Sequence, residues 1–213
     1  MAIKPILFNT ETVRAILNGR KSCTRRIVKP QQFIGMLPDK CKNGVPEEFL
    51  KKKKFMFKPY CDMTDIELIN TSYKAPYQPG DILYVRETFI QAAAHIFWYK
   101  ADNNSWISEG LRWKPSIHMP KEAARIWLKV TDVRVERLQD ITGLSVQKEG
   151  IEVDPKECAS KFDFITELFL LFQRLWDSTI KKSDLDHYGW DVNPYVWVIE
   201  FEQCEKPKEE KKK

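Results

Sequence analysis

The residues best suited to chemistry lie in one short stretch near the N-terminus, residues 19–26. Arginine and lysine bind phosphate groups, and hydroxyls can donate hydrogen bonds to the same oxygens. A lysine near a hydroxyl is also a pair that can activate a nucleophile. The stretch is therefore the candidate active or ligand-binding loop. Its polar side chains are Arg20, Lys21, Ser22, Cys23, Thr24, Arg25 and Arg26.

The elements before this loop are predicted to hold it in place. Residues 3–8 have the pattern of a short strand, and Asn9 or Thr10 can cap a helix that runs to about residue 18. Gly19 is the expected stop of that helix. The loop, residues 21–26, follows at once, so its N-terminal side is expected to be rigid.

Later segments predict a small β-rich domain. The turn at 79–81, Pro-Gly-Asp, leads into a strand over 82–89. Residues 124–137 predict one long or bulged strand with period two, and 192–201 a closing strand. Residues 96–101 are expected to pair with a segment after residue 104.

Two helices are expected late in the chain, a short one that ends at Gly150 and a strongly amphipathic one over 162–177. The aromatic stripe of the second helix is more typical of a core than of a cofactor site. Periodicity fades over 31–76, which indicates an insertion. Because strands and helices do not alternate regularly, the pattern predicts an α+β fold, a small mixed barrel with peripheral helices, and disfavours a doubly wound sheet.

Composition places the chain among folded, cytoplasmic proteins. It has 213 residues, 43% of them hydrophobic and 31% charged, which suits one domain. The net charge is +5, and residues 1–60 hold 14 Lys and Arg against 4 Asp and Glu, which favours polyanionic partners such as nucleic acid. Five cysteines without regular spacing, no signal peptide and no long apolar run predict free thiols and no membrane association.

Several catalytic patterns are absent from the sequence. It has no P-loop, no G-x-G-x-x-G, no H-E-x-x-H and no Cys/His zinc pattern. The three histidines, His95, His118 and His187, share no spacing that suggests a ligand set. We therefore expect no metal and no cofactor.

The 16–26 stretch resembles the G-x-K-x-x-T-x-R signature of the ASCH domain, a PUA-like β-barrel family. The Pro-Gly-Asp turn at 79–81, the strand and L-x-D-I-T segment within 130–151, and the strand at 196–201 are similar to later landmarks of that family. The resemblance implies one PUA-like domain over 1–204, with insertions at about 31–76 and 152–195 and a charged, disordered tail at 205–213. In overall length the chain is similar to ASCH proteins carried by bacteriophages and prophages.

Small bacterial ASCH proteins include N4-acetylcytidine amidohydrolases, which use a lysine and a threonine of this loop and a glutamate of the later helix. The matching positions are Lys21, Thr24 and Glu149. The resemblance implies that Thr24 attacks the amide, Lys21 accepts its proton, and Glu149 orients water or moves a proton. Ser22 stands where the motif has a threonine, and Arg26 matches the closing arginine.

The same region also suits binding without chemistry. The candidate phosphate- or nucleic-acid-binding residues are Arg20, Ser22, Arg25, Arg26 and, on the strand after the Pro-Gly-Asp turn, Arg86. The first hypothesis is a protein that binds RNA, DNA or a modified nucleotide, and the second is a hydrolase for N4-acylated cytidines. Two further alternatives are a ribonuclease, for which no histidine pair is evident, and a phage protein that binds a host protein through residues 31–76.

Geometry separates binding from chemistry. In a flat strand Lys21 and Thr24 would point to opposite faces, because side chains alternate with period two. If they cooperate, residues 21–24 must form a turn or bulge. Convergence of Lys21, Thr24 and Glu149 within hydrogen-bond reach around a pocket favours chemistry, whereas an open basic shelf favours binding.

Overall fold

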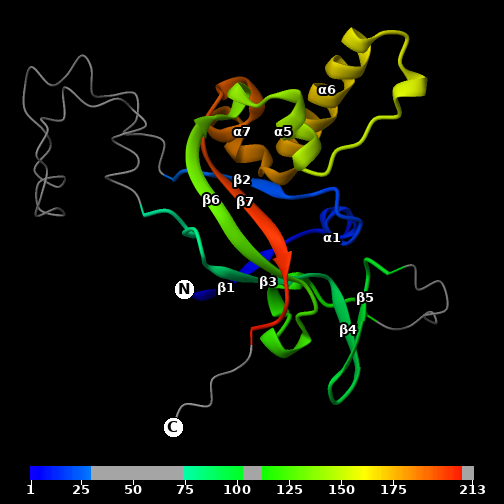
Figure 1. Ribbon diagram of the computed structural model, residues 1–213, viewed down its shortest axis with the longest axis vertical. Helices are drawn as coiled ribbons and strands as arrows, with labels where there is room; N and C mark the ends of the chain where they lie inside the picture. Colours follow the sequence, from blue (N-terminus) through cyan, green and yellow to red (C-terminus); the bar gives the residue numbers. More distant parts are fainter. Residues whose placement is uncertain (30–73, 103–111, 208–213) are drawn as a thin grey trace, which may run out of the picture.

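A computed structural model describes residues 1–29, 74–102 and 112–207 and shows an α+β fold, as the sequence predicts (Figure 1). Its centre is a five-stranded sheet with the order β1-β3-β6-β7-β2. Strands β1 and β3 are parallel and the other neighbours are antiparallel, so the sheet is mixed. The five strands are β1 (Ile3–Leu7), β2 (Cys23–Ile27), β3 (Ile82–Arg86), β6 (Trp127–Arg137) and β7 (Tyr195–Cys204).

The sheet has two edges among the described residues, β1 and β2, and no ladder joins them, so the expected barrel is not confirmed. A side chain connects the two edges instead. Arg26 of β2 donates a hydrogen bond from Nη2 to the main-chain oxygen of Leu7 at 2.9 Å. The two ends of the sheet are thus held near each other at the position of the candidate site.

Strands β6 and β7 form the long ribbon at the centre of Figure 1. The register of β6 shifts between Val130 and Asp132, which confirms the bulged strand predicted at 124–137. Strand β7 is buried on both faces: Trp197 and Ile199 belong to one core cluster, Val196 and Val198 to another. That double burial explains the continuous apolar run of this strand.

The helices confirm the predicted pattern. Helix α1 (Thr10–Leu17) begins after Asn9, whose Oδ1 accepts from the Thr12 amide at 2.8 Å. Helix α5 (Gly143–Lys148) is capped by Thr142, and helix α6 (Lys161–Thr179) follows the predicted amphipathic segment. Together with the short α7 (Leu185–Tyr188), α5 and α6 lie beside β2 at one end of the β6–β7 ribbon (Figure 1).

One local prediction was wrong. The segment 21–26 is not simply a loop, because from Cys23 onward it is strand β2, paired with β7. Strand β5 (Ile96–Tyr99) pairs with β4 (Phe89–Ala93), and the partner segment expected after residue 104 lies largely outside the described residues. Phe89 contacts Phe97 within this hairpin, with ring centroids 6.2 Å apart, and such aromatic pairs stabilise neighbouring strands.

The Pro-Gly-Asp turn is tied to the first residues of the chain. The Asp81 carboxylate accepts from the Ala2 amide at 2.9 Å, from the Gln78 amide at 3.1 Å and from Lys4 Nζ at 2.6 Å. The pKa of Asp81 is lowered below its ordinary value, and the hydrogen bond from Lys4 is the largest cause.

Three expectations concern residues that lie largely outside the described part. They are the insertion at 31–76, the tail at 205–213 and the segment after residue 104 that was expected to pair with residues 96–101. Across the described residues, no helix has the length and apolar character that a bilayer crossing requires.

Candidate functional site

The connection from α1 to β2 turns tightly around the end of the helix. Gly19 has φ of +70°, and the amides of Arg20 and Lys21 both donate to the Ala15 oxygen, at 2.9 and 3.1 Å. The Ser22 amide then donates to the Lys148 oxygen at 2.9 Å, so the chain passes alongside the end of α5. These bonds fix the backbone on which Lys21 and Thr24 stand.

Lys21 and Glu149 form a buried ion pair, although 128 positions separate them. Lys21 Nζ lies 2.6 Å from Glu149 Oε2 and donates to the Glu149 main-chain oxygen at 2.8 Å. Their side chains are only 4% and 6% exposed. Removing one partner of such a pair leaves a buried charge unpaired and typically costs about 3–5 kcal/mol.

Arg25 reaches the same carboxylate from the other side. Its Nη1 lies 3.0 Å from Glu149 Oε1, and its Nη2 lies 3.4 Å from Glu136 Oε2 on β6. Its side chain is 1% exposed and its guanidinium lies 6.0 Å from the ring centroid of Phe172. Its Nε has no hydrogen-bond partner among the described residues, which is rare for a buried donor.

A cavity of about 200 Å³ brings these groups together at the open edge of β2. Side chains alternate along β2: Arg25 lies on the α6 side, whereas Thr24 and Arg26 lie on the side of Phe8. All three nevertheless line the same cavity, because the cavity extends around the edge of the strand. Its lining residues come from β1, α1, β2, α5 and α6 and include polar and aromatic side chains. They are Leu7, Phe8, Asn9, Thr12, Lys21, Thr24, Arg25, Arg26, Glu149, Phe172, Leu175, Trp176 and Thr179.

Thr24 lies on β2 and contributes a hydroxyl side chain to the lining of this cavity. It is 4% exposed, and among the described residues its side chain makes no hydrogen bond. A hydroxyl that lines the same cavity as a lysine–glutamate pair is an arrangement suited to nucleophilic attack.

The main chain of β2 adds a further donor. Val28 N donates to the Tyr195 oxygen and Phe201 N to the Ser22 oxygen. The backbone N–H and C=O groups of the even-numbered residues in and beside β2 therefore point toward β7. In an antiparallel ladder the residues between them direct N–H and C=O away from the partner strand. The Arg25 amide therefore points to the open edge of the sheet.

Burial changes the ionisation of two neighbouring groups. Burial raises the pKa of Cys23 to about 12, with the negative charge of Glu149 adding to the effect. A thiol in that state is a poor nucleophile at neutral pH. Burial lowers the pKa of Arg26, and the nearby charges of Tyr77 and Glu149 oppose that change.

Lys21 and Thr24 do line one cavity, but residues 21–24 do not form the expected turn or bulge: the turn lies before them, at residues 18–19, and β2 begins at Cys23. Lys21 pairs through its backbone with Glu149, while Ser22 and the residues after it follow β7. The change of partner between Lys21 and Ser22 is what lets both side chains reach the same cavity.

The other candidate residues lie elsewhere. Arg20 pairs with Glu152 at 2.9 Å on the surface. Arg86 donates from Nε to the Met119 oxygen at 2.8 Å and from Nη2 to the Ile117 oxygen, so its side chain points away from the cavity. Ser22 is half-buried and does not line it.

Sequence reasoning missed four residues of the site: Phe8, Glu136, Phe172 and Trp176. Phe8 lies 5.9 Å from Lys21 Nζ and 5.4 Å from the Arg26 guanidinium, measured from its ring centroid. Phe172 and Trp176 belong to the aromatic stripe of α6. They are part of a hydrophobic core cluster and also line the cavity, so the stripe contributes to both the core and the candidate site. The aromatic turn around Trp190 braces the helix, since Trp190 packs edge-on against Phe172 at 5.9 Å.

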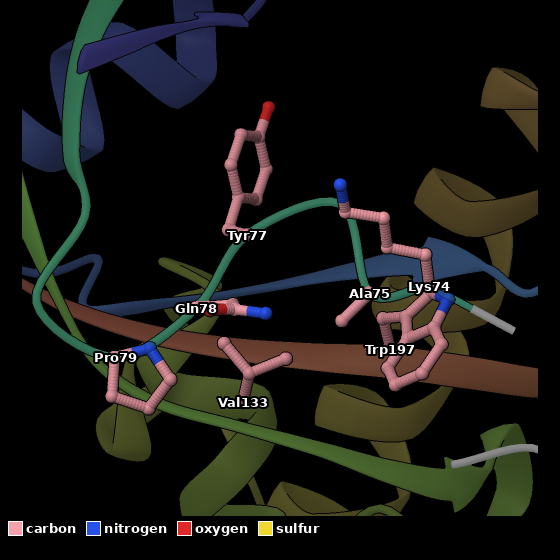
Figure 2. A pocket seen from close by; sticks show the side chains of 7 residues that line it. All are labelled: Lys74, Ala75, Tyr77, Gln78, Pro79, Val133 and Trp197. Carbon is pink, nitrogen blue, oxygen red and sulfur yellow. The ribbon is translucent and has the colours of Figure 1, made fainter. Parts of the chain in front are cut away.

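A second cavity, of about 440 Å³, lies under residues 74–79. Figure 2 shows this segment passing over Val133 of β6 and Trp197 of β7. Its lining includes one charged side chain, Lys74, and Tyr77 donates its hydroxyl to the Pro5 oxygen. It therefore lacks the carboxylate and hydroxyl that accompany the basic groups of the first cavity.

No cluster of three or more His, Cys, Asp or Glu side chains that could hold a metal ion occurs within the described ranges. Neither a protein-family model nor a curated protein matches the sequence. Among solved structures, the chain is similar to the ASCH domain from Lactobacillus crispatus JV V101. The TM-score is 0.37 and the identity 11%, over 95% of this chain and 79% of that one. A likeness at that TM-score supports no conclusion about this chain.

Proposed function

We propose that this chain is an ASCH-type hydrolase that removes an acyl group from the exocyclic nitrogen of a modified cytidine. The observation that carries the proposal is that Lys21, Thr24 and Glu149 line one cavity. The three positions come from the sequence resemblance. Lys21 and Glu149 lie within hydrogen-bond reach of each other, at 2.6 Å, and Thr24 lines the same cavity. Sequence-distant polar residues that line one cavity are a strong indication of a site.

The size of the cavity favours a small ligand. Pockets for drug-sized ligands typically measure about 300–1,000 Å³, and this one measures about 200 Å³. Phe8, Phe172 and Trp176 supply aromatic surface against which a base can stack. A nucleoside therefore suits the cavity better than an oligonucleotide.

The charges of the site also disfavour a phosphate clamp. Lys21 and Arg25 are paired with Glu149, Arg25 also with Glu136, and Arg20 with Glu152. The positive charge of a cation that is already paired with a buried carboxylate is largely balanced, so it attracts a phosphate only weakly. The cavity is thus better suited to a neutral nucleoside than to a nucleotide.

The proposed reaction conserves every proton. Lys21 passes a proton to Glu149 across the 2.6 Å contact, and its neutral amine takes the proton of Thr24 as the hydroxyl oxygen attacks the acyl carbon. Glu149 gives its proton to the cytidine nitrogen as the C–N bond breaks, which leaves an acyl ester on Thr24. Water then attacks the ester and gives a proton to Glu149, the Thr24 oxygen takes one from Lys21, and Glu149 returns its proton to Lys21.

The developing oxyanion needs a donor that is in place beforehand. The Arg25 amide, which points to the open edge of β2, is suited to that role.

The test compares Thr24→Val with Thr24→Ser. Because the Thr24 hydroxyl makes no hydrogen bond within the described fold, valine should leave the melting temperature nearly unchanged. We expect Thr24→Val to lower kcat for N4-acetylcytidine by about 10³-fold or more, and serine to keep part of it. Release of acetate and cytidine is the measurement, and Lys21→Ala and Glu149→Gln should also be inactive.

Wild-type protein that does not hydrolyse N4-acetylcytidine, or a Thr24→Val variant with full activity, would contradict the proposal.

The alternative is a nucleic-acid-binding protein, favoured by the excess of Lys and Arg over residues 1–60. It predicts salt-sensitive retention on RNA or DNA that falls in the Arg25→Ala and Arg26→Ala variants. Absence of retention at low salt would remove this alternative.

A further inference from the structure

Arg25 occupies a position that the sequence motif leaves open, yet its side chain is only 1% exposed, against 4% for Lys21 and 6% for Glu149. It lies between two carboxylates, Glu149 at 3.0 Å and Glu136 at 3.4 Å. A buried arginine with two acidic neighbours is held in one orientation by both. These contacts place Arg25 where it can influence the Glu149 carboxylate.

Glu149 has both oxygens engaged. Lys21 Nζ holds Oε2 at 2.6 Å, and Arg25 Nη1 holds Oε1 at 3.0 Å. We propose that Arg25 is a positioning residue that fixes the Glu149 carboxylate and determines how readily it keeps a proton during turnover. This inference rests on the proposed function, because the proton is the one exchanged between Lys21 and Glu149.

Glu136 opposes Arg25. Its Oε2 faces Arg25 Nη2, and its Oε1 accepts from Arg134 Nε at 2.6 Å. A cation near a carboxylate favours the ionised form, and a further anion near the cation weakens that effect. Loss of the Arg25 charge and loss of the Glu136 charge should therefore act on Glu149 in opposite directions.

The other charged or titratable groups that face Glu149 are Lys21, Cys23 and Arg26. Lys148 on the same helix is directed elsewhere, to Glu200 at 3.6 Å. These groups are unchanged in the variants below, so the comparison isolates Arg25 and Glu136.

The experiment is the pH dependence of kcat/KM for N4-acetylcytidine in wild type, Arg25→Gln, Arg25→Lys and Glu136→Gln. Arg25→Gln should move the acidic limb to higher pH by about 1 unit, because a carboxylate without its cation is protonated more readily. Glu136→Gln should move it to lower pH by a smaller amount. Arg25→Lys keeps the positive charge but loses the planar guanidinium geometry. The acidic limb should therefore lie at the wild-type pH, while kcat stays reduced.

The matched control is Arg125→Gln. Arg125 holds the buried Glu87 through two bonds, at 2.9 and 3.1 Å, outside the cavity. Its loss should lower stability without moving the acidic limb. Circular dichroism at each pH shows which variants are folded, and Glu136→Gln tests the sign even if Arg25→Gln does not fold.

The outcomes are distinct. Acidic limbs that move in opposite directions for Arg25→Gln and Glu136→Gln support the inference. Limbs that coincide with wild type, or that move together, overturn it while the proposed function stands. Wild type without hydrolysis overturns the proposed function and this inference with it.

Discussion

Glu149 is the residue on which the site converges. Its two oxygens are taken by two different cations, so its carboxylate has no freedom to rotate. A group held in one orientation before the substrate arrives needs no reorganisation at the moment of reaction. The pairing with carboxylates also explains why Arg20, Lys21 and Arg25 are not free to act as a phosphate clamp, whereas Arg26 donates to the Leu7 main-chain oxygen.

Cys23 stands between Ser22 and Thr24 and supplies a prediction at this scale. It is 1% exposed, and its pKa is raised to about 12 by burial, so its thiolate is scarce at pH 8. We expect Cys23 to resist alkylation by iodoacetamide in the folded protein at pH 8 and to react in guanidinium chloride. Mass spectrometry of the peptide that contains Cys23 measures both states, and rapid labelling of native protein would contradict the burial.

Strand β2 is the element that assembles the site. As an edge strand it presents a free side to the cavity, while α6 covers one of its faces and the β1–α1 junction the other. The end of α5 adds Glu149 through the close approach of Gly150 to the α1–β2 connection. At Gly150, which has φ of +91°, a Cβ would lie 2.7 Å from the Ala15 Cβ and 3.1 Å from the Lys21 Cβ.

Gly150→Ala tests that close approach. The strain of an alanine at positive φ costs about 1 kcal/mol, and the contact with Ala15 and Lys21 should add a similar or larger amount. Gly19→Ala is the control, because its φ is +70° but no atom lies within 4 Å of the added Cβ. Urea denaturation should show a larger loss of unfolding free energy for Gly150→Ala, and equal losses would argue against the contact.

The sequence was informative where a local rule applied. Asn9 as a cap, the bulged strand and the aromatic helix follow from hydrogen bonding and periodicity. The strand nature of residues 23–27 was missed because it depends on β7, far along the chain. Glu136 and Phe8 were missed because neither has a local signal. Glu136 reaches the site through the pairing of β6 with β7 and of β7 with β2, and Phe8 through ring contacts with Lys21 and Arg26.

At the scale of the whole molecule, Asp81 joins the first residues to the central sheet. The carboxylate accepts from Ala2, Gln78 and Lys4, and its pKa lies below the ordinary 3.8. A carboxyl with a lowered pKa in the folded state contributes stability above its unfolded pKa. That contribution is lost as the pH falls through the folded value.

Asp81→Asn should therefore lower the unfolding free energy by about 1–3 kcal/mol at pH 7. The difference from wild type should begin to shrink below about pH 4, where the unfolded carboxyl becomes protonated, and should be lost as the pH falls through the lower pKa of the folded protein. Urea denaturation of both proteins at pH 7 and pH 3 measures the two differences. A difference that is the same at both values would show that the charge of Asp81 is not what matters.

Among the described strands, β2 has β7 as its sheet partner, and β7 begins at Tyr195. During synthesis, Lys21 and Thr24 leave the ribosome early, but the strand that holds them in place emerges after every other strand of the described sheet. The site therefore cannot form on the growing chain before β7 has emerged. A ribosome stalled before residue 195 would carry a nascent protein with every proposed catalytic residue and no functional site.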